Sequence, residues 1–163
     1  MIVRRLWPAD WRANREIRLE ALADSPGAYF TSSAEAAARS DAQWQAMVAD
    51  PDMAVFGLFE AEQLVGLTAI YIDKDDPAGR TAGLAMSYIR PAWRARGLTR
   101  LLYEARLDWA RERGLARVRV SHRDGNEPSR RAILAHGFRR VGATPHRWPD
   151  GATADNVSYE LLL

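Results

Sequence analysis

Two apolar runs joined by a short polar turn constrain the fold of this chain more than any other feature. The runs cover residues 54–59 and 64–72, and Glu60-Ala61-Glu62-Gln63 separates them. Apolar runs of this length with a short turn between them are typical of an antiparallel hairpin. The middle of the chain is therefore expected to contribute an antiparallel strand pair to a sheet.

Strand and helix patterns continue on both sides of this hairpin. The expected elements, in chain order, are a strand at 2–6, helices at 10–24 and 33–49, the hairpin, a strand at 82–89, a helix at 100–113, a strand at 116–122, a helix at 129–136, and strands at 138–141 and 157–163. This order predicts a mixed α/β fold with a largely antiparallel front half. The length of 163 residues suits a single domain that spans 1–163.

Composition excludes several kinds of chemistry. The chain has no cysteine, which removes disulfides, a cysteine acyl-enzyme and thiolate metal ligands together, and we expect no metal site. No run of about 18 apolar residues occurs, as a membrane-spanning helix would need. The N-terminal Met1-Ile2-Val3-Arg4-Arg5 lacks the apolar core of a signal peptide. We expect a soluble cytoplasmic protein with no membrane partner.

The basic residues are almost all arginine. Of 23 basic residues only Lys74 is a lysine, which leaves 22 arginines, and 21 acidic residues bring the net charge to +2. A planar guanidinium suits phosphate oxygens, but a general compositional preference for arginine accounts for most of them. They are scattered along the chain and supply no extended basic field, so no nucleic-acid partner is expected.

One strand-to-helix junction, Ile89–Arg100, indicates a phosphate site. The start of a helix presents free backbone N–H groups and the positive end of the helix dipole, and both favour an anion. Gly97 lets a phosphate approach the backbone, and Thr99 adds a hydroxyl donor. The basic side chains around this point are Arg94, Arg96 and Arg100. The stretch is neither a Walker loop nor a dinucleotide fingerprint, because it lacks the glycines and the lysine of those motifs.

A second stretch, Asn126–Phe138, indicates structure when it is taken alone. Asn126 suits the N-cap of a helix and Pro128 suits its first turn. Gly137 suits the C-terminal cap, and Phe138 begins the next strand.

Together the two stretches resemble the GCN5-related N-acetyltransferase (GNAT) family. That family carries a Gln/Arg-x-x-Gly-x-Gly/Ala loop after a strand that ends in Val-x-Pro, and later Asn-x-x-Ala/Ser and Gly-Phe. The matching residues here are Ile89-x-Pro91, Arg94-x-x-Gly97-x-Thr99, Asn126-x-x-Ser129 and Gly137-Phe138. Thr99 departs from the small residue usual at its position. The family's order of strands and helices matches the order expected for the whole chain.

The resemblance implies a fold, an activity and a set of binding residues. The fold is a mixed, mostly antiparallel central sheet with flanking helices and a splayed pair of parallel strands. The activity is transfer of an acetyl group from acetyl-CoA to an amine, with pantetheine along the strand that ends near Ile89 and beside Asn126. The residues implied for cofactor binding are Ile89, Arg90, Arg94, Ala95, Arg96, Gly97, Leu98, Thr99, Arg100, Asn126 and Ser129.

The catalytic groups are less clearly indicated. A lysine-like amine has a pKa of about 10.4, so reaching the neutral nucleophile at pH 7 costs about 4.6 kcal/mol and calls for a base. Our hypothesis is a water-mediated base with His122 as the leading side chain, the alternative being a histidine that caps the following turn. Tyr88 and Ser87 are the polar residues on the strand at 84–89, which has no carboxylate.

The protonation of the leaving thiolate is also open. The family's usual tyrosine acid falls at Ile133, which has no proton to give. Ser129 is one substitute, although it could merely cap its helix. Alternatively no acid is needed, because the coenzyme A thiolate is a tolerable leaving group.

No motif specifies the acceptor. A small-molecule amine is the first interpretation, and the parts expected to form its site contain Tyr29, Phe30, Trp44 and Trp148. Trp148 either lines an apolar pocket from an exposed position or packs on the core. A protein or peptide N-terminus is an alternative that would need an open groove. A catalytically silent domain that binds coenzyme A for regulation is another. A homodimer is compatible with all three.

Overall fold

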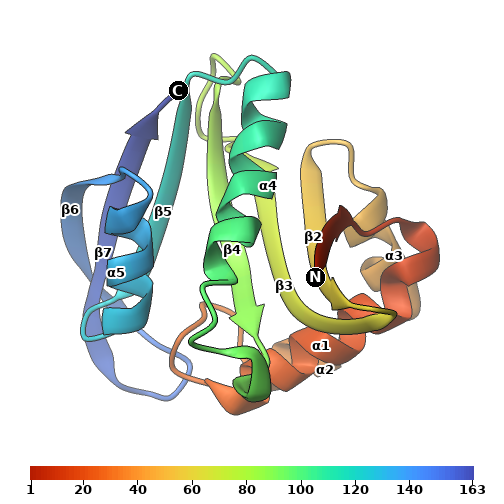
Figure 1. The fold of residues 1–163 in the computed structure, drawn as a ribbon. Helices are drawn as coiled ribbons and strands as arrows, with labels where there is room; N and C mark the ends of the chain where they lie inside the picture. The colour runs from red at the N-terminus through yellow and green to blue at the C-terminus, as the bar shows by residue number, and fades with distance from the viewer.

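A seven-stranded sheet forms the centre of the computed structural model, which describes residues 1–163 (Figure 1). The strands, in spatial order, are β1 (Ile2–Arg5), β2 (Met53–Glu60), β3 (Gln63–Ile72), β4 (Thr81–Ile89), β5 (Arg117–Arg123), β7 (Thr153–Leu162) and β6 (Arg139–Arg147). Neighbouring strands are antiparallel except for β4 and β5, which are parallel. The predicted hairpin is the β2–β3 pair, and the mixed, mostly antiparallel sheet is confirmed.

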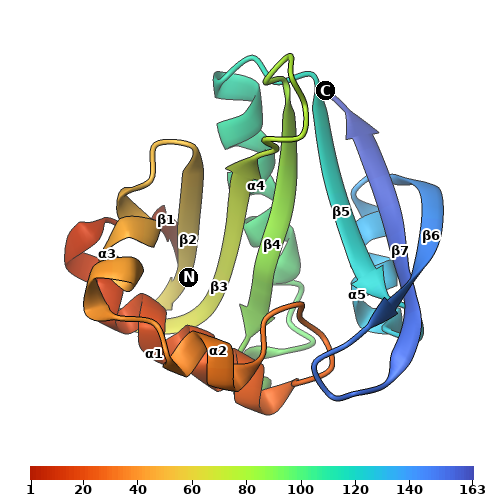
Figure 2. The ribbon, with the colours of Figure 1, turned by 180° about the vertical axis from the view of Figure 1, so that it is seen from behind.

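Helices cover both faces of this sheet. Figure 1 shows α4 (Thr99–Glu112) and α5 (Glu127–Ala135) on the face nearer the viewer. The opposite face, turned forward in Figure 2, carries α1 (Trp11–Asp24), α2 (Ser33–Ala37) and α3 (Asp41–Ala49). Short 3-10 turns precede α1 and α4, at Pro8–Asp10 and Pro91–Trp93. Each face of the sheet therefore buries its own apolar cluster.

The single helix predicted at 33–49 is wrong, because the chain forms two helices there. The Ser40 hydroxyl accepts a hydrogen bond from the Gln43 N–H (3.2 Å), and the Gln43 side chain accepts one from the Ser40 N–H (2.8 Å). This reciprocal capping box starts α3 anew and separates it from α2.

The last two strands are longer than predicted. The sequence indicated strands at 138–141 and 157–163, whereas β6 and β7 pair from Arg139–Glu160 to Arg147–Thr153. Most of β6 is exposed, and it contains Pro145. An exposed edge strand shows no apolar run and tolerates proline, so its sequence hides its length.

Trp44 lies in the core of the protein. A residue of the acceptor pocket would have to border a cleft, and Trp44 does not. Its side chain is 0 % exposed and packs among the apolar residues beneath α1 and α3. That part of the expected acceptor site is therefore wrong. Complete burial of a large aromatic side chain stabilises the folded state, so Trp44 contributes to the stability of the fold.

The parallel strands β4 and β5 separate soon after they begin. They pair only from Thr81–Arg117 to Gly83–Arg119, and Figure 2 shows them moving apart toward the end of the sheet where α4 begins. A bulge in β4 lies within the separated part: Leu67 is opposite Tyr88 and Ala69 is opposite Ala85, so two residues of β4 face Thr68 alone. One of these two, Met86, has a φ of 60°. Since bulges bend strands, this irregularity accompanies the divergence.

Candidate active site

The loop that precedes α4 presents a row of free backbone donors. The N–H groups of the four residues from Ala95 to Leu98 donate to no backbone or side-chain acceptor. Ala95 has a φ of 60° and Gly97 a φ of 71°, so residues in the left-handed conformation alternate with residues of negative φ along the loop. Successive N–H groups in such a conformation converge on a common point and bind anions. The loop predicted to bind phosphate therefore offers backbone N–H donors.

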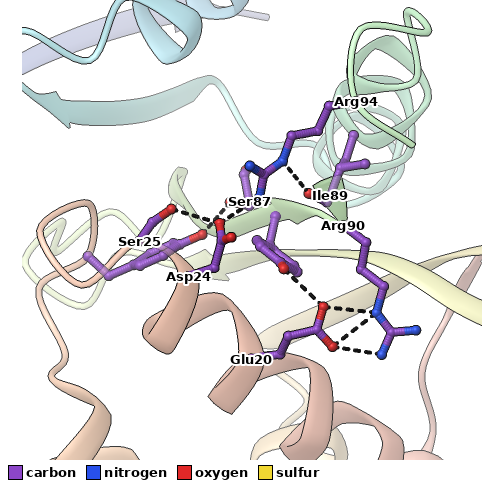
Figure 3. Close-up of polar contacts among 9 residues, drawn as sticks. Glu20, Asp24, Ser25, Ser87, Ile89, Arg90 and Arg94 are labelled. Carbon is purple, nitrogen blue, oxygen red and sulfur yellow. Dashed lines mark hydrogen bonds and ion pairs between the residues drawn. The ribbon is translucent and has the colours of Figure 1, made fainter. Parts of the chain in front are cut away.

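The three arginines at this junction bind partners elsewhere. Arg94 donates to the Asp24 carboxylate (Nη2–Oδ2, 2.6 Å) and to the Ile89 carbonyl (Nε–O, 2.7 Å), as Figure 3 shows. Arg96 donates to the Ala92 carbonyl (2.8 Å), and Arg100 pairs with Glu104 one turn further along α4. The guanidinium groups therefore do not converge on the free N–H groups.

Arg90 lies on the α1 side of β4, away from the loop. Its guanidinium binds both oxygens of Glu20 at 2.8–3.0 Å, and the Tyr88 hydroxyl donates to the same carboxylate (2.9 Å; Figure 3). Hydrogen bonds from Arg90 hold the pKa of Glu20 below its usual range. Burial and the Glu20 carboxylate raise the pKa of the Tyr88 phenol well above its ordinary value. The Tyr88 phenol thus keeps its proton and donates it in the hydrogen bond to Glu20.

A cleft of about 1140 Å³ follows the opening between β4 and β5. Side chains from the α1–α2 connection, β4, α4, β5 and α5 border it. The predicted site residues that it brings together are Tyr88, Ile89, Arg94, Ala95, Gly97, Leu98, Thr99, His122, Asn126 and Ser129. Arg90, Arg96 and Arg100 do not border it.

His122 borders the cleft with both ring nitrogens engaged. Nδ1 lies 2.7 Å from the Arg123 carbonyl oxygen, and Nε2 lies 3.0 Å from the Tyr159 hydroxyl. A carbonyl only accepts, so Nδ1 carries the proton and Nε2 accepts from Tyr159. The residue is 5 % exposed. Its neutral form therefore has no free lone pair in this arrangement.

Asn126 and Ser129 share the start of α5. The Asn126 side-chain oxygen accepts from the Ser129 N–H (3.3 Å), so Asn126 caps this helix. The Ser129 hydroxyl does not act as the cap and borders the cleft.

Ser87, within the β4 bulge, is fixed from both faces of the sheet. On the α1 side the Tyr29 hydroxyl donates to its carbonyl (2.9 Å). On the other side Arg106 of α4 donates to its hydroxyl (Nη1–Oγ, 2.9 Å), and Thr68 lies 3.1 Å from the same atom. Sequence reasoning missed Arg106, although a charged residue four positions after Leu102 on the apolar face of a helix is a signal.

At one end of the cleft, non-covalent contacts join the α1–α2 connection to β5 and to the turn between β6 and β7. Trp148 is 3 % exposed, and its ring stacks on Phe30 with centroids 5.2 Å apart. Arg123 donates to Asp150 (2.6 Å) and to the Gly27 carbonyl (3.1 Å). Figure 2 shows the α1–α2 connection beside the turn that joins β6 and β7. Of the two alternatives for Trp148, the buried one is therefore observed, and its stacking partner Phe30 borders the cleft.

The structure has neither a membrane-spanning helix nor a cluster of metal ligands. None of its helices has the length and apolar character needed to cross a lipid bilayer. No three His, Asp or Glu side chains gather as metal ligands would.

Several solved structures share this fold along almost the whole chain. The yncA protein of Salmonella typhimurium, solved with its cofactor acetyl-CoA, has a TM-score of 0.85 at 21% identity, covering 100% of this chain and 94% of its own. A ribosomal-protein-alanine N-acetyltransferase from Brucella melitensis has a TM-score of 0.82 at 19% identity, with 100% of both chains covered. A GCN5-related N-acetyltransferase from Kribbella flavida has a TM-score of 0.82 at 21% identity, covering 99% and 97%. Likeness at these identities shows the fold.

Sequence similarity identifies the family independently. No curated protein is similar to the chain at a significant level. The model of the acetyltransferase (GNAT) family, however, matches residues 15–138, which is most of the chain. That range includes the loop before α4, the bulge of β4 and the start of α5. The chain therefore belongs to the GNAT acetyltransferase family.

Proposed function

We propose that this protein transfers an acetyl group from acetyl-CoA directly to the primary amine of a small molecule. The observation that carries the proposal is the opening between β4 and β5 with four free N–H groups at its end. A long, flexible thioester with a phosphorylated end suits this arrangement. Family membership and the acetyl-CoA bound to yncA support the same co-substrate.

The residues present fit coenzyme A along its length. The pyrophosphate would accept from the N–H groups of Ala95 to Leu98. The edge of β4 beyond Gly83 has no partner in β5, so its backbone is available to the amide groups of pantetheine. Asn126 and Ser129 border the opposite side of the cleft. Because Arg94 donates to the Ile89 carbonyl, a pantetheine amide that uses this carbonyl would replace that bond.

Acetyl transfer requires balanced proton movement. The amine nitrogen attacks the thioester carbon, the carbon–sulfur bond breaks, and the electron pair leaves on the coenzyme A sulfur. The proton of the amine passes to water, and Ser129, which borders the cleft, is the donor that we propose for the thiolate; its hydroxyl recovers a proton from water as it gives its own to the sulfur. Backbone N–H groups at the β4 bulge would stabilise the oxyanion, as fixed donors do in other acyl transfers. With no cysteine in the chain, no cysteine acyl-enzyme intervenes.

The covered end of the cleft supports a small acceptor. The connection between α1 and α2 is held to β4 through Tyr29, to Arg123 of β5 through the Gly27 carbonyl, and to the β6–β7 turn through the stacking of Phe30 on Trp148. A peptide acceptor needs an open groove for the chain that follows its first residue. These contacts leave less room for a peptide chain than for a free amine.

Acetyl-CoA and an amine panel test this function. We expect acetyl-CoA at millimolar concentration to raise the melting temperature by several degrees, since a ligand that binds only the folded state stabilises it. Thiol release should exceed the rate without enzyme for at least one small primary amine. No thermal shift would contradict coenzyme A binding, and binding without turnover on any amine would favour a regulatory domain.

Gly97→Ala tests the phosphate site. The new Cβ would meet no atom, so the change acts only on the left-handed φ, which costs a non-glycine residue about 1–2 kcal/mol. If the free loop relaxes, this cost appears on binding, and acetyl-CoA affinity falls roughly 5- to 30-fold. Affinity for acetyl-pantetheine, which lacks the pyrophosphate, should stay constant. Gly79→Ala is the matched control, because Gly79 also has a positive φ and open surroundings but does not border the cleft. Equal losses for both ligands would contradict the assignment.

His122→Gln tests the origin of the catalytic base. Because both nitrogens of His122 are engaged, we expect the pH dependence of kcat to keep its midpoint in the variant. A moderate loss of rate is compatible with the loss of the contact to Tyr159. A profile that loses its acidic limb would instead identify His122 as the base. The measurement is the thiol-release rate from pH 6 to 9 at saturating acetyl-CoA.

A further inference from the structure

Arg18 is a buried cation without an ion pair. It lies on α1, is 5 % exposed, and borders the cleft. Its Nε and Nη1 atoms are covered and make no hydrogen bond. Burial lowers the pKa of Arg18 to about 10, and no carboxylate contributes to its surroundings. The guanidinium nevertheless stays charged at neutral pH.

Three other arginines at or near the cleft have conventional partners. Arg94 pairs with Asp24, and Arg119 pairs with Asp73 and Glu160. Arg106, which is more deeply buried, donates to the Leu102 carbonyl and the Ser87 hydroxyl. A covered charge without an opposite charge is unfavourable. Arg18 therefore suggests a ligand that brings the missing anion.

A second cation borders the same end of the cleft. Arg39, between α2 and α3, lies close enough for its charge to lower the pKa of Arg18. It has no ion pair, and its guanidinium rests over the face of Trp44, 5.3 Å from the ring centroid. Glu35 lies close enough to Arg39 for their charges to interact, but no carboxylate acts in this way on Arg18, so the two cations keep a positive potential that attracts an anionic group.

The position of Arg18 relates this potential to the reaction. Its guanidinium carbon lies 4.5 Å from the centroid of the Tyr29 ring, and the Tyr29 hydroxyl donates to the Ser87 carbonyl at the β4 bulge. The Tyr29 ring thus separates the cation from the bulge where the thioester would lie. An acceptor whose anionic group contacted Arg18 would extend along this ring and bring its amine toward the bulge.

Apolar side chains complete this end of the cleft. Met47, Met53 and Met86 border it and are partly buried. Methionine side chains are flexible and adapt to apolar ligands of different shapes.

We propose that Arg18, assisted by Arg39, binds the carboxylate of the acceptor, and that the acceptor is a free amino acid with an apolar side chain. This inference rests on the proposed function and names its substrate class. The planar guanidinium suits the two oxygens of a carboxylate, and the methionines would contact the side chain. The α-amine attacks the thioester carbon, coenzyme A leaves as the thiolate, and the products are an N-acetyl amino acid, coenzyme A and one proton.

Matched acceptors give the first test. Thiol release is measured with L-leucine, its amide L-leucinamide, and 3-methylbutylamine, and the comparison is repeated with L-phenylalanine and its amide. We expect kcat/KM for the amino acids to exceed that for the amides by at least about tenfold, a ratio equal to about 1.4 kcal/mol. Amino acids that react no faster than their amides would overturn the proposal, as would amino acids that do not react. A preference for the amides would favour peptide N-termini.

Arg18→Met gives the second test, because methionine keeps much of the length over Tyr29 and removes the charge. We expect KM for the preferred amino acid to rise at least tenfold, while kinetics with the amide and affinity for acetyl-CoA change less than twofold. Arg18→Lys should recover part of the loss. Arg15→Met, on the same helix but not at the cleft, is the control and should behave as the wild type.

The two proposals fail in different ways. Equal losses by Arg18→Met with the amino acid and the amide would show that Arg18 only supports the fold, which overturns the substrate class. Should Arg18→Met not fold, the acid-to-amide ratio of Arg18→Lys decides, and a ratio unchanged from wild type would overturn the proposal. The proposed function itself fails only if acetyl-CoA does not bind, or if no amine of any class promotes thiol release.

Discussion

The short pairing between β4 and β5 is the constraint on which the site depends. Beyond Gly83 and Arg119 these parallel strands do not pair, and the backbone of β4 is left with an open edge. An open edge inside a protein needs another source of hydrogen bonds. Here the edge lies along the cleft, which ends at the loop before α4. A ligand with amide groups along its length and phosphates at one end satisfies both features together.

Maintaining this opening requires support from both faces of the sheet. The β4 bulge is held through Ser87 by Tyr29 on one face and by Arg106 on the other. Further along β4, the bonds of Tyr88 and Arg90 to Glu20 attach the strand end to α1. Polar contacts that span the two layers therefore keep the backbone donors of β4 in place, and rigid placement is what makes such donors effective on a developing charge.

The two buried arginines show how the same residue type serves different purposes. Arg106 donates to a carbonyl and a hydroxyl, and its guanidinium also rests over the Tyr103 ring at 4.3 Å. Its covered Nη2 has no hydrogen-bond partner, but Arg106 does not border the cleft, so these contacts fit a role in the fold. Arg18 has only the face of Tyr29 and makes no hydrogen bond through its covered nitrogens. The difference between the two is the reason for assigning a ligand to Arg18 alone.

Local features of the chain predicted more than long-range ones. The hairpin and the start of α4 depend on residues close in sequence, and both were predicted within a few positions. The helix break before Ser40 also has a local cause, the capping box to Gln43, and was overlooked. Contacts such as Tyr29–Ser87 and Glu20–Arg90 join residues 58 and 70 positions apart, so no local pattern reveals them. The phosphate site at the loop before α4 stays a prediction. The direction of Arg94 toward Asp24, 70 positions away, could not be predicted from a local pattern.

Backbone amide NMR of the loop before α4 tests the central claim most directly. Uniformly 15N-labelled protein is titrated with acetyl-CoA and, separately, with acetyl-pantetheine. The free N–H groups of Ala95 to Leu98 should shift strongly downfield with acetyl-CoA, because each gains a charged acceptor, and should change little with acetyl-pantetheine. Saturation by acetyl-CoA without a shift of these four amides, or equal shifts with both ligands, would contradict a pyrophosphate at this loop.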